Sequence, residues 1–357
     1  MRIDARQHSE IFFIGDLHGD MQPLLETLRL TRCVAVPDDA MVAARVCHAG
    51  AKDRSGYPLT IAQQHTIRWT GGTQAIVFLG DVLDNRRSAK DDPIGRCQKT
   101  GTQFQMINII LQLQKEATRT GGKVVFCLGN HDVENVVNTQ GSFCSRYAPL
   151  RQFDGTRDYD TCDANGGYSK THRTLVRKKL KEAGACVLVR VTNGDNAILA
   201  CHGGLTDIDT LRPLLGLQPL QFDRNVDVFD RLFRTALLQP KHPHHAQSLR
   251  TIQEHDSIMP TWCRPKRLDN QDDLQTFFGA TKLIKGHDLQ LTAGGASDPN
   301  CNVGGKVRPL EKRAMADGEV CRIDVGMSRA FNTTKVFCVL GITADQDTDA
   351  LYRTVYR

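Results

Sequence analysis

The amino-acid sequence predicts an α/β fold, and three observations lead to this class. Five short apolar runs are continuously hydrophobic, as expected for strands that are covered on both faces. Amphipathic helical patterns lie between some of these runs, and the succession of strand, loop, helix and strand is the signature of α/β proteins. Each run also ends in a small cluster of Asp, His or Asn residues beside glycine.

Each predicted strand leads into one polar cluster. The predicted strands are residues 11–14, 76–79, 124–128, 197–201 and 283–284. The clusters that follow them, in the same order, are residues 15–20, 80–86, 129–132, 202–204 and 285–288. Because ligands of α/β sheets gather at the carboxyl ends of the strands, we expect the five clusters to converge although they are remote in sequence.

Helical patterns fill part of the space between the strands. Residues 21–30 and 104–117 each place leucine or isoleucine side chains on one face. A basic stretch at 173–181 alternates with Leu and Val and is interpreted as the outer face of a further helix.

The chain length of 357 residues suits one large α/β domain that carries inserts. We expect a single domain over residues 1–357, with its core at about 11–328. Three segments are interpreted as inserts: a mixed segment at 31–70, a long loop at 138–172, and a helical cap over the site at 205–260.

Charge and cysteine content narrow the class of protein. The net charge of +6 suits a phosphate-bearing substrate but is too low for a dedicated nucleic-acid binder. The 12 cysteines form no C-x-x-C pair, which argues against zinc ribbons and thioredoxin-like redox pairs. Several lie inside apolar runs as small hydrophobic residues, which indicates a reducing compartment. With no signal-peptide core and no membrane-length apolar stretch, we expect a soluble cytoplasmic protein and no membrane partner. Its oligomeric state is left open.

The polar clusters contain the residue types that bind catalytic divalent metals, namely carboxylates, imidazoles and an amide. Asp16 and His18 are one residue apart in a nearly extended segment, so their side chains point the same way and can grip one metal. Asp81 can bridge two metals through its two carboxylate oxygens. The second metal would be completed by Asn130, His202 and His287. We expect two divalent ions, manganese foremost, with iron or zinc as alternatives.

Such a site suits the hydrolysis of phosphate esters. Two cations about 3.5–4 Å apart activate a bridging water and clamp the phosphoryl oxygens of an in-line displacement. His131 follows Asn130 and is our candidate general acid, and Asp84 would hold its imidazole in the protonated form. Arg86 and Arg264 are candidates for binding the phosphate. A solvated loop residue remains an open interpretation for Arg86, as does an ordinary interface residue for Arg264.

The five clusters resemble the motifs of the calcineurin-like metallophosphoesterases, specifically of the phosphoprotein phosphatase branch, and they occur in the same order along the chain as in that family. The chain has G-D-L-H-G at 15–19, G-D-V-L-D at 80–84, G-N-H-D at 129–132, H-G-G at 202–204 and G-H at 286–287. The first cluster, W-C-R at 262–264 and R-I-D-V-G-M-S at 322–328 are most similar to the bacterial-type, Shewanella-like phosphatases. The resemblance spans about residues 11–328 through these islands.

The resemblance implies a central β-sandwich flanked by helices, with a dinuclear metal site at the carboxyl edge of the strands. It implies one metal on Asp16, His18 and Asp81, with His131 and Asp84 as the proton-donating pair. The second metal would be held by Asp81, Asn130, His202 and His287. The substrate would be a phosphoprotein, dephosphorylated on serine, threonine or tyrosine by attack of hydroxide on phosphorus.

The chain departs from the family pattern at three positions. Asn85 stands where the family has an arginine, with Arg86 one residue later, so the phosphate contact is in question. Asp132 replaces a glutamate, and Asp288 replaces a common hydroxyl residue. Two alternative functions therefore stay open: a dinucleoside polyphosphate hydrolase or phosphodiesterase, which needs a slot for a base, and a weakened phosphoprotein-binding scaffold, which binds without turnover.

Overall fold

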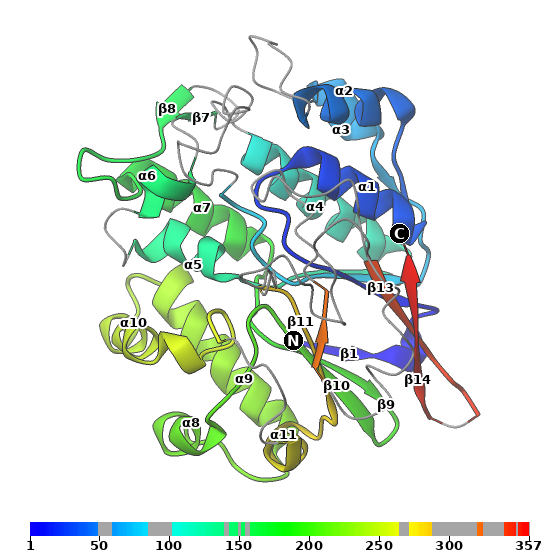
Figure 1. Ribbon diagram of the computed structural model, residues 1–357, viewed down its shortest axis with the longest axis vertical. Coiled ribbons are helices and arrows are strands. Elements are labelled where there is room, and N and C mark those ends of the chain that lie inside the picture. The colour runs from blue at the N-terminus through cyan, green and yellow to red at the C-terminus, as the bar shows by residue number, and fades with distance from the viewer. Residues whose placement is uncertain are drawn as a thin grey trace, which may run out of the picture.

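Two five-stranded sheets form the centre of the computed structural model, which describes residues 1–48, 59–84, 102–138, 143–148, 151–153, 158–263, 271–287, 320–323, 339–347 and 349–356 (Figure 1). The first sheet has the order β14 (Leu351–Tyr356), β13 (Val339–Ala344), β2 (Ile11–Ile14), β5 (Ala75–Phe78) and β6 (Lys123–Phe126). The second has the order β1 (Arg2–Asp4), β9 (Val189–Asn193), β10 (Asn196–Cys201), β11 (Lys282–Lys285) and β12 (Val320–Arg322).

Parallel pairing puts the predicted polar clusters at one edge of each sheet. In the first sheet β2, β5 and β6 run parallel, and in the second β10, β11 and β12 do so. All five predicted strands are present, and β2 has the predicted bounds. The carboxyl ends of β2, β5 and β6 therefore point the same way.

The two sheets pack face to face, so the expected sandwich is confirmed. Alternate side chains of a strand point to opposite faces, and β2 shows this division clearly. Its Phe13 packs with Val77 and Ile198 in the core between the sheets. Its Phe12 packs instead in the core beneath the helices. This two-sided burial explains why the strands are continuously apolar in sequence.

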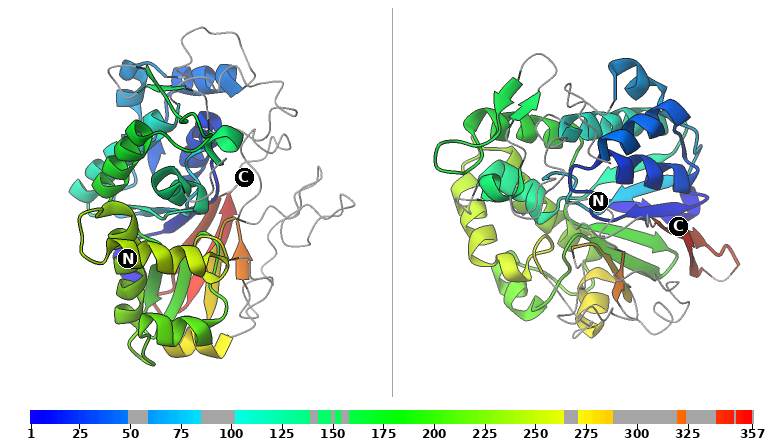
Figure 2. Two further views of the ribbon diagram at one scale, coloured as in Figure 1. Left: turned by 90° about the vertical axis from the view of Figure 1, so that its left-hand side faces the viewer. Right: turned by 45° about the horizontal axis from the view of Figure 1, so that its top comes forward.

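Helices cover the outer faces of both sheets (Figures 1 and 2). The predicted helices at 21–30, 104–117 and 173–181 are confirmed as α1 (Met21–Thr31), α4 (Thr102–Arg119) and α7 (Lys170–Glu182). The carboxylate of Asp20 accepts from the Gln22 backbone nitrogen at 3.3 Å and so caps α1, whose Leu24 and Leu28 are fully buried. The larger of the two main apolar clusters lies between the sheets and their helices, and it joins Phe12 of β2 and Leu24 of α1 to Leu199 of β10 and Phe229 of the second sheet's outer layer.

The segments interpreted as inserts contain regular structure. Segment 31–70 carries β3 (Val34–Ala35), α2 (Asp38–His48), α3 (Ile61–Thr66) and β4 (Arg68–Trp69). Segment 138–172, which we expected to be a loop, carries α6 (Phe143–Tyr147) and the hairpin of β7 (Arg151–Phe153) and β8 (Asp158–Asp160). A disulfide joins Cys144 to Cys162, and the sequence had not indicated it. The short elements and this bond give the segment defined structure in place of a long loop.

The segment expected as a cap lies mainly on the second sheet. It contains α8 (Ile208–Leu215), α9 (Phe222–Phe233), the π-helical turn η3 (Arg234–Leu238), α10 (His245–Glu254) and the 3-10 turn η4 (Asp256–Ile258). Helix α9 buries Val226, Phe229 and Phe233 and contacts β9 and α11 (Gln271–Phe278), so it forms an outer layer of the sandwich. Only the last part of the segment reaches the strand ends. There the carbonyl oxygen of Pro260 accepts a hydrogen bond from the backbone N–H of Gly203, which follows β10.

The remaining elements are the 3-10 turn η1 (Ala5–Gln7), which follows β1, and the helix α5 (Asn130–Val137), which follows β6. Within the described residues, none of the helices has the length and apolar character needed to cross a membrane.

Candidate metal centre

The ends of five strands bring the predicted site residues together. The loop after β2 is fastened to the loop after β5, because Leu17 and His18 both donate backbone N–H groups to the carbonyl of Asp81, at 3.1 and 2.7 Å. The side chains of the predicted metal ligands and of the predicted acid pair are all buried. These residues are Asp16, His18, Asp81, Asp84, Asn130, His131, His202 and His287.

Four of these residues adopt the left-handed backbone conformation, which side chains other than glycine rarely take. The φ angles are +43° at His18, +48° at Asp81, +67° at Asp84 and +65° at His287. Such conformations cost about 1–3 kcal/mol each and concentrate at functional sites, where the surrounding structure holds them. The turns thus direct these polar side chains toward one another at a cost in backbone energy.

Two glycines allow the chain to approach the carboxylates closely. A Cβ atom at Gly129 would lie 2.2 Å from Oδ1 of Asp81, and one at Gly286 would lie 2.4 Å from Oδ1 of Asp16. Both distances are far below van der Waals contact. In the space so left, the backbone N–H of His287 lies 3.2 Å from each oxygen of Asp16. The glycines before Asn130 and His287 are therefore required by the packing of the site.

One group of metal-type atoms is centred on His202. Its Nδ1 lies 2.9 Å from the carbonyl oxygen of Leu79, which places a proton on Nδ1, so the neutral form of the ring has its lone pair on Nε2. That Nε2 lies 3.0 Å from Oδ1 of Asn130, 3.0 Å from Nδ1 of His287 and 3.3 Å from Oδ2 of Asp81. Four electron-rich atoms converge, an arrangement that a cation would stabilise. The donor set therefore fits a divalent metal.

A second group of metal-type atoms shares Asp81 with the first. Ligand atoms of His18, Asp81 and His131 lie within 4.8 Å of one another, as do those of Asp81, His202 and His287. His18 Nε2 lies 3.8 Å from Oδ2 of Asp16 and also 3.8 Å from Oδ2 of Asp81. Asp81 is thus the carboxylate common to both groups, as a bridging ligand must be.

The electrostatic surroundings of Asp81 favour its charged form. Burial opposes ionisation, but attraction to the neighbouring rings of His202, His131 and His18 in their protonated form outweighs it and holds the pKa of this carboxyl well below its usual value. Asp81 is therefore held as a charged carboxylate, the form that can bind metal cations.

The predicted acid pair is assembled beside these groups. Nδ1 of His131 lies 3.0 Å from Oδ2 of Asp84, and Nε2 of His131 lies 4.0 Å from Oδ2 of Asp81. The carboxylate of Asp84 thus contacts one ring nitrogen while the other faces the metal-type residues. This is the geometry required of an imidazole that donates a proton near the reacting atoms.

Asp132, the residue that departs from the family glutamate, connects two loops of the site. Its carboxylate accepts from the backbone nitrogens of Gly129 at 2.9 Å and Leu83 at 3.3 Å. Burial, together with the charge of Asp81, raises the pKa of Asp132 well above its usual value. The shorter side chain therefore still spans the gap between the loops after β5 and β6.

Sequence reasoning missed several residues that surround the acid pair. The hydroxyl of Tyr168 donates to Asp84, and Nδ2 of Asn135 lies 2.9 Å from the same oxygen. Asn135 is four residues after His131 on α5 (Asn130–Val137), a spacing that places both on one helix face and was an available signal. The ring of Phe143 lies 4.8 Å from that of His131. The distance in sequence hid Tyr168, which is 84 residues from Asp84.

The candidates for phosphate binding lie outside the described residues. These are Arg86 and Arg264, together with two of the departures from the family pattern, Asn85 and Asp288. Trp262, which precedes Arg264 by two residues, is described, and its ring lies 5.9 Å from that of His287.

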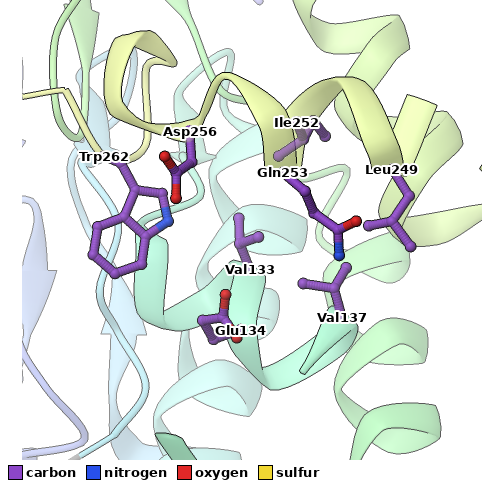
Figure 3. Close-up of a pocket in the computed structure, with 8 residues that line it drawn as sticks. All are labelled: Val133, Glu134, Val137, Leu249, Ile252, Gln253, Asp256 and Trp262. Carbon is purple, nitrogen blue, oxygen red and sulfur yellow. The ribbon is translucent and has the colours of Figure 1, made fainter. Parts of the chain in front are cut away.

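A pocket of about 300 Å³ opens beside the metal centre, between α5 and α10 (Figure 3). Val133, Val137 and Leu249 give it apolar walls. Glu134 and Asp256 add two carboxylates, and Trp262 lies at the same end as Asp256. The pocket therefore combines an apolar lining with negative charge.

Comparisons with known proteins agree with this geometry. A family model described as calcineurin-like phosphoesterase matches residues 9–291. The Shewanella-like protein phosphatase 2 of Arabidopsis thaliana is 28% identical over 123 residues, which are 34% of this chain and 20% of that protein. The match thus spans about a fifth of the curated relative.

Solved structures share the fold. The cold-active protein-tyrosine phosphatase of a psychrophilic Shewanella sp. superposes with a TM-score of 0.51 at 13% identity, over 100% of this chain and 82% of that chain. Another structure of a cold-active protein tyrosine phosphatase gives a TM-score of 0.53 at 14% identity, over 99% and 77%. At such identities the likeness concerns the fold alone.

Proposed function

Because the chain belongs to the calcineurin-like phosphoesterase family, we propose that it is a metal-dependent phosphatase that hydrolyses phosphate monoesters on phosphoproteins. The observation that carries this proposal is the position of Asp81, which is common to two groups of metal-type atoms. The His131–Asp84 pair lies directly beside it. A shared carboxylate with an adjacent proton donor is what in-line transfer of a phosphoryl group to water needs.

The metals are assigned to the residues that converge in the site. Asp16, His18 and Asp81 would hold one ion. The other would be held by Asp81, Asn130, His202 and His287. The chemistry that such cations supply is activation of water and neutralisation of charge on the phosphoryl oxygens. Nitrogen and oxygen donors without thiolate suit manganese, with iron or zinc as alternatives.

The residues of the chain then divide the work of the reaction. Asp84 fixes the imidazole of His131 through Nδ1, so Nε2 is directed into the site and can protonate the departing alkoxide or phenoxide. The burial of the pair limits competition from water for this proton transfer. We assign phosphoserine, phosphothreonine and phosphotyrosine as the substrate class, and Arg86 and Arg264 as the residues that bind the phosphate.

The alternative of a nucleotide substrate fits the described pocket poorly. Trp262 can stack on a base, but Glu134 and Asp256 in the same pocket would repel a polyphosphate. The alternative of a scaffold without turnover would require a damaged site, and the described metal-type residues and acid pair are in place. Phosphoprotein hydrolysis is therefore the function that these residues support best.

The cytoplasmic location stays a prediction. Within the described part of the chain, the buried thiols of Cys33, Cys127, Cys186, Cys201 and Cys263 agree with a reducing compartment. The disulfide between Cys144 and Cys162 is the observation against it, because disulfides persist mainly in oxidising compartments.

The proposed function is tested by hydrolysis of p-nitrophenyl phosphate by metal-stripped protein that is re-supplied with manganese, zinc, iron or magnesium. Metal-restored turnover, followed by release of phosphate from phosphopeptides, is the expected result. Absence of turnover on every ester with metals shown to be bound would refute the proposal. His131→Asn should keep its metals yet lose on the order of 10² in turnover of esters with poor leaving groups. Loss of the metals in this variant would instead reassign His131 as a ligand.

A further inference from the structure

Asp84 receives three hydrogen-bond donors on a single oxygen. Nδ1 of His131 lies 3.0 Å from Oδ2, Nδ2 of Asn135 lies 2.9 Å from it, and the hydroxyl of Tyr168 donates to it as well. All four side chains are buried. The orientation of this carboxylate is therefore determined by Asn135 and Tyr168 as well as by its catalytic partner.

We propose that Tyr168 is a positioning residue of the hydrolysis, whose hydroxyl holds Asp84 in the orientation from which Asp84 fixes the proton-donating ring of His131. This inference rests on the proposed function. Asn135 assists, since its amide nitrogen also lies 3.0 Å from the Tyr168 hydroxyl oxygen. Every donor on Oδ2 thus has a fixed place relative to the others.

The protonation of Tyr168 suits this role. Burial, the charge of Asp84 and the hydrogen bond to it raise the pKa of the phenol well above its usual value. The hydroxyl thus keeps its proton and donates it to the carboxylate, and it accepts from Asn135 through its lone pair. A hydrogen bond to an ionised group is about twice as strong as a neutral one.

A second layer of contacts fixes the amide of Asn135. Nε2 of His172 lies 2.5 Å from Oδ1 of Asn135, and the hydroxyl of Tyr159 lies 3.0 Å from Nδ1 of His172. Burial lowers the pKa of His172 to about 4, so the ring is neutral near pH 7. With the Tyr159 hydroxyl donating to Nδ1, the proton of His172 is on Nε2 and the amide nitrogen of Asn135 is directed at Asp84.

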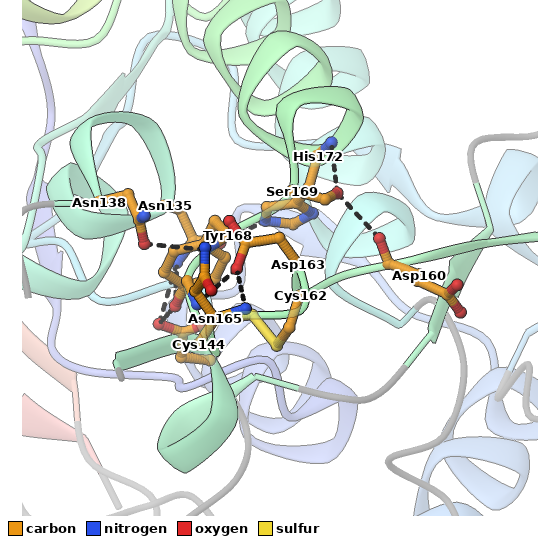
Figure 4. Close-up of a disulfide and its surroundings, with 12 residues drawn as sticks. Asn135, Asn138, Cys144, Asp160, Cys162, Asp163, Asn165, Tyr168, Ser169 and His172 are labelled. Carbon is orange, nitrogen blue, oxygen red and sulfur yellow. Dashed lines mark hydrogen bonds between the residues drawn. A yellow bond between two sulfur atoms is a disulfide. The ribbon is translucent and has the colours of Figure 1, made fainter. Parts of the chain in front are cut away.

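The segment that carries Tyr168 is itself anchored (Figure 4). Its backbone nitrogen donates to Oδ1 of Asn138 at 2.8 Å, at the end of the helix that begins with the catalytic motif. Tyr168 also pairs with Cys162 as an isolated bridge, and Cys162 is bonded to Cys144 of α6. The tyrosine is thereby held from both its backbone and its ring side, where it stacks on His172 with ring centroids 5.2 Å apart.

The experiment compares Tyr168→Phe with Tyr159→Phe in the full chain loaded with manganese. Both changes remove one buried hydroxyl, but the second hydroxyl bonds His172 rather than Asp84. Turnover is measured on p-nitrophenyl, phenyl and benzyl phosphate, whose leaving groups depend increasingly on protonation. We expect Tyr168→Phe to lose about 10-fold on benzyl phosphate and under about 3-fold on p-nitrophenyl phosphate, a fraction of the 10² or more that general acids contribute. Tyr159→Phe should show the same dependence in a weaker form, because its hydroxyl acts on Asp84 only through His172 and Asn135.

A double-mutant cycle separates positioning from a general structural effect. In the Asp84→Asn background, Tyr168→Phe should cause no further loss on benzyl phosphate, because the hydroxyl acts through Asp84. An equal loss on all three esters, or an undiminished loss in that background, would overturn the inference while leaving the phosphatase assignment intact. Inactivity of the metal-loaded wild type on every ester would refute the function itself. If Tyr168→Phe does not fold, as judged by circular dichroism, Asn135→Ser removes a donor from the same oxygen and must give the same pattern.

Discussion

Replacement of Gly286 by alanine should weaken metal binding through a single misplaced carboxylate. The new Cβ would lie 2.4 Å from Oδ1 of Asp16, about 1 Å closer than the roughly 3.5 Å at which nonbonded heavy atoms are best separated. The carboxylate must withdraw by a distance of that order, whereas metal–ligand distances tolerate about 0.2 Å. Its contacts with the backbone nitrogen of His287, at 3.2 Å, would be disturbed as well.

We expect manganese affinity to fall about 10- to 100-fold in Gly286→Ala, the usual cost of disturbing the surroundings of a metal ligand. The affinity is measured by competition with a chelator of known strength on metal-stripped protein. Turnover should return at high manganese, because the catalytic groups are unchanged. Gly122→Ala is the matched control, since its Cβ would lie 2.5 Å from the carbonyl oxygen of Gly72. Gly122 directly precedes β6, so this clash lies at the end of the strand that faces away from the metal-type residues. A folded Gly286→Ala protein with wild-type affinity would refute the reasoning.

Three further predictions follow from the site and its surroundings. Asp81→Asn should reduce turnover by on the order of 10³ with an unchanged circular dichroism spectrum, because the amide offers one neutral oxygen to two cations; unchanged turnover would remove the bridging role. Cys144→Ser should lower the free energy of unfolding in urea by about 3 kcal/mol, because it removes the disulfide to Cys162. A reductant should lower the urea midpoint of the wild type to that of the variant, and an unchanged midpoint in both would contradict this prediction. The pKa of His172 is about 4 in the folded protein and 6.5 in the unfolded chain, so the unfolded chain takes up the proton more readily. The contribution of the neutral ring to the free energy of unfolding is therefore complete above pH 6.5. It is lost progressively as the pH falls to 4, by about 3 kcal/mol in total. Urea titrations at several pH values should show this slope, and His172→Gln should flatten it.

The metal-type residues could be predicted because each follows a strand with a strong local pattern. Both faces of β2 and β5 are buried, so these strands are continuously apolar, and the parallel order sends Asp16 and Asp81 to one edge. The left-handed turns at His18 and Asp81 are marked by glycines beside them in the sequence. Local chemistry and sheet topology therefore carried the prediction of the site without knowledge of any tertiary contact.

The support of the acid pair could not be predicted in the same way. Tyr168 is 84 residues from Asp84 in sequence and lies in a polar segment whose composition indicated a loop. The pairing of Cys144 with Cys162 had no signal either, since connectivity among many cysteines does not follow from their positions. A helical cap was predicted at 205–260, but a helical pattern does not say which face of the sandwich a helix such as α9 covers.

Because the metal-type residues come from both sheets, bound metals would also affect the stability of the fold. Asp16, Asp81 and Asn130 follow strands of the first sheet, whereas His202 and His287 follow strands of the second. An ion held by Asp81 and His202 would therefore link the first sheet to the second, and its binding energy would oppose separation of the two sheets on unfolding. The supply of metal in the surroundings would then set how long the molecule survives heat and proteases, as well as how fast it works.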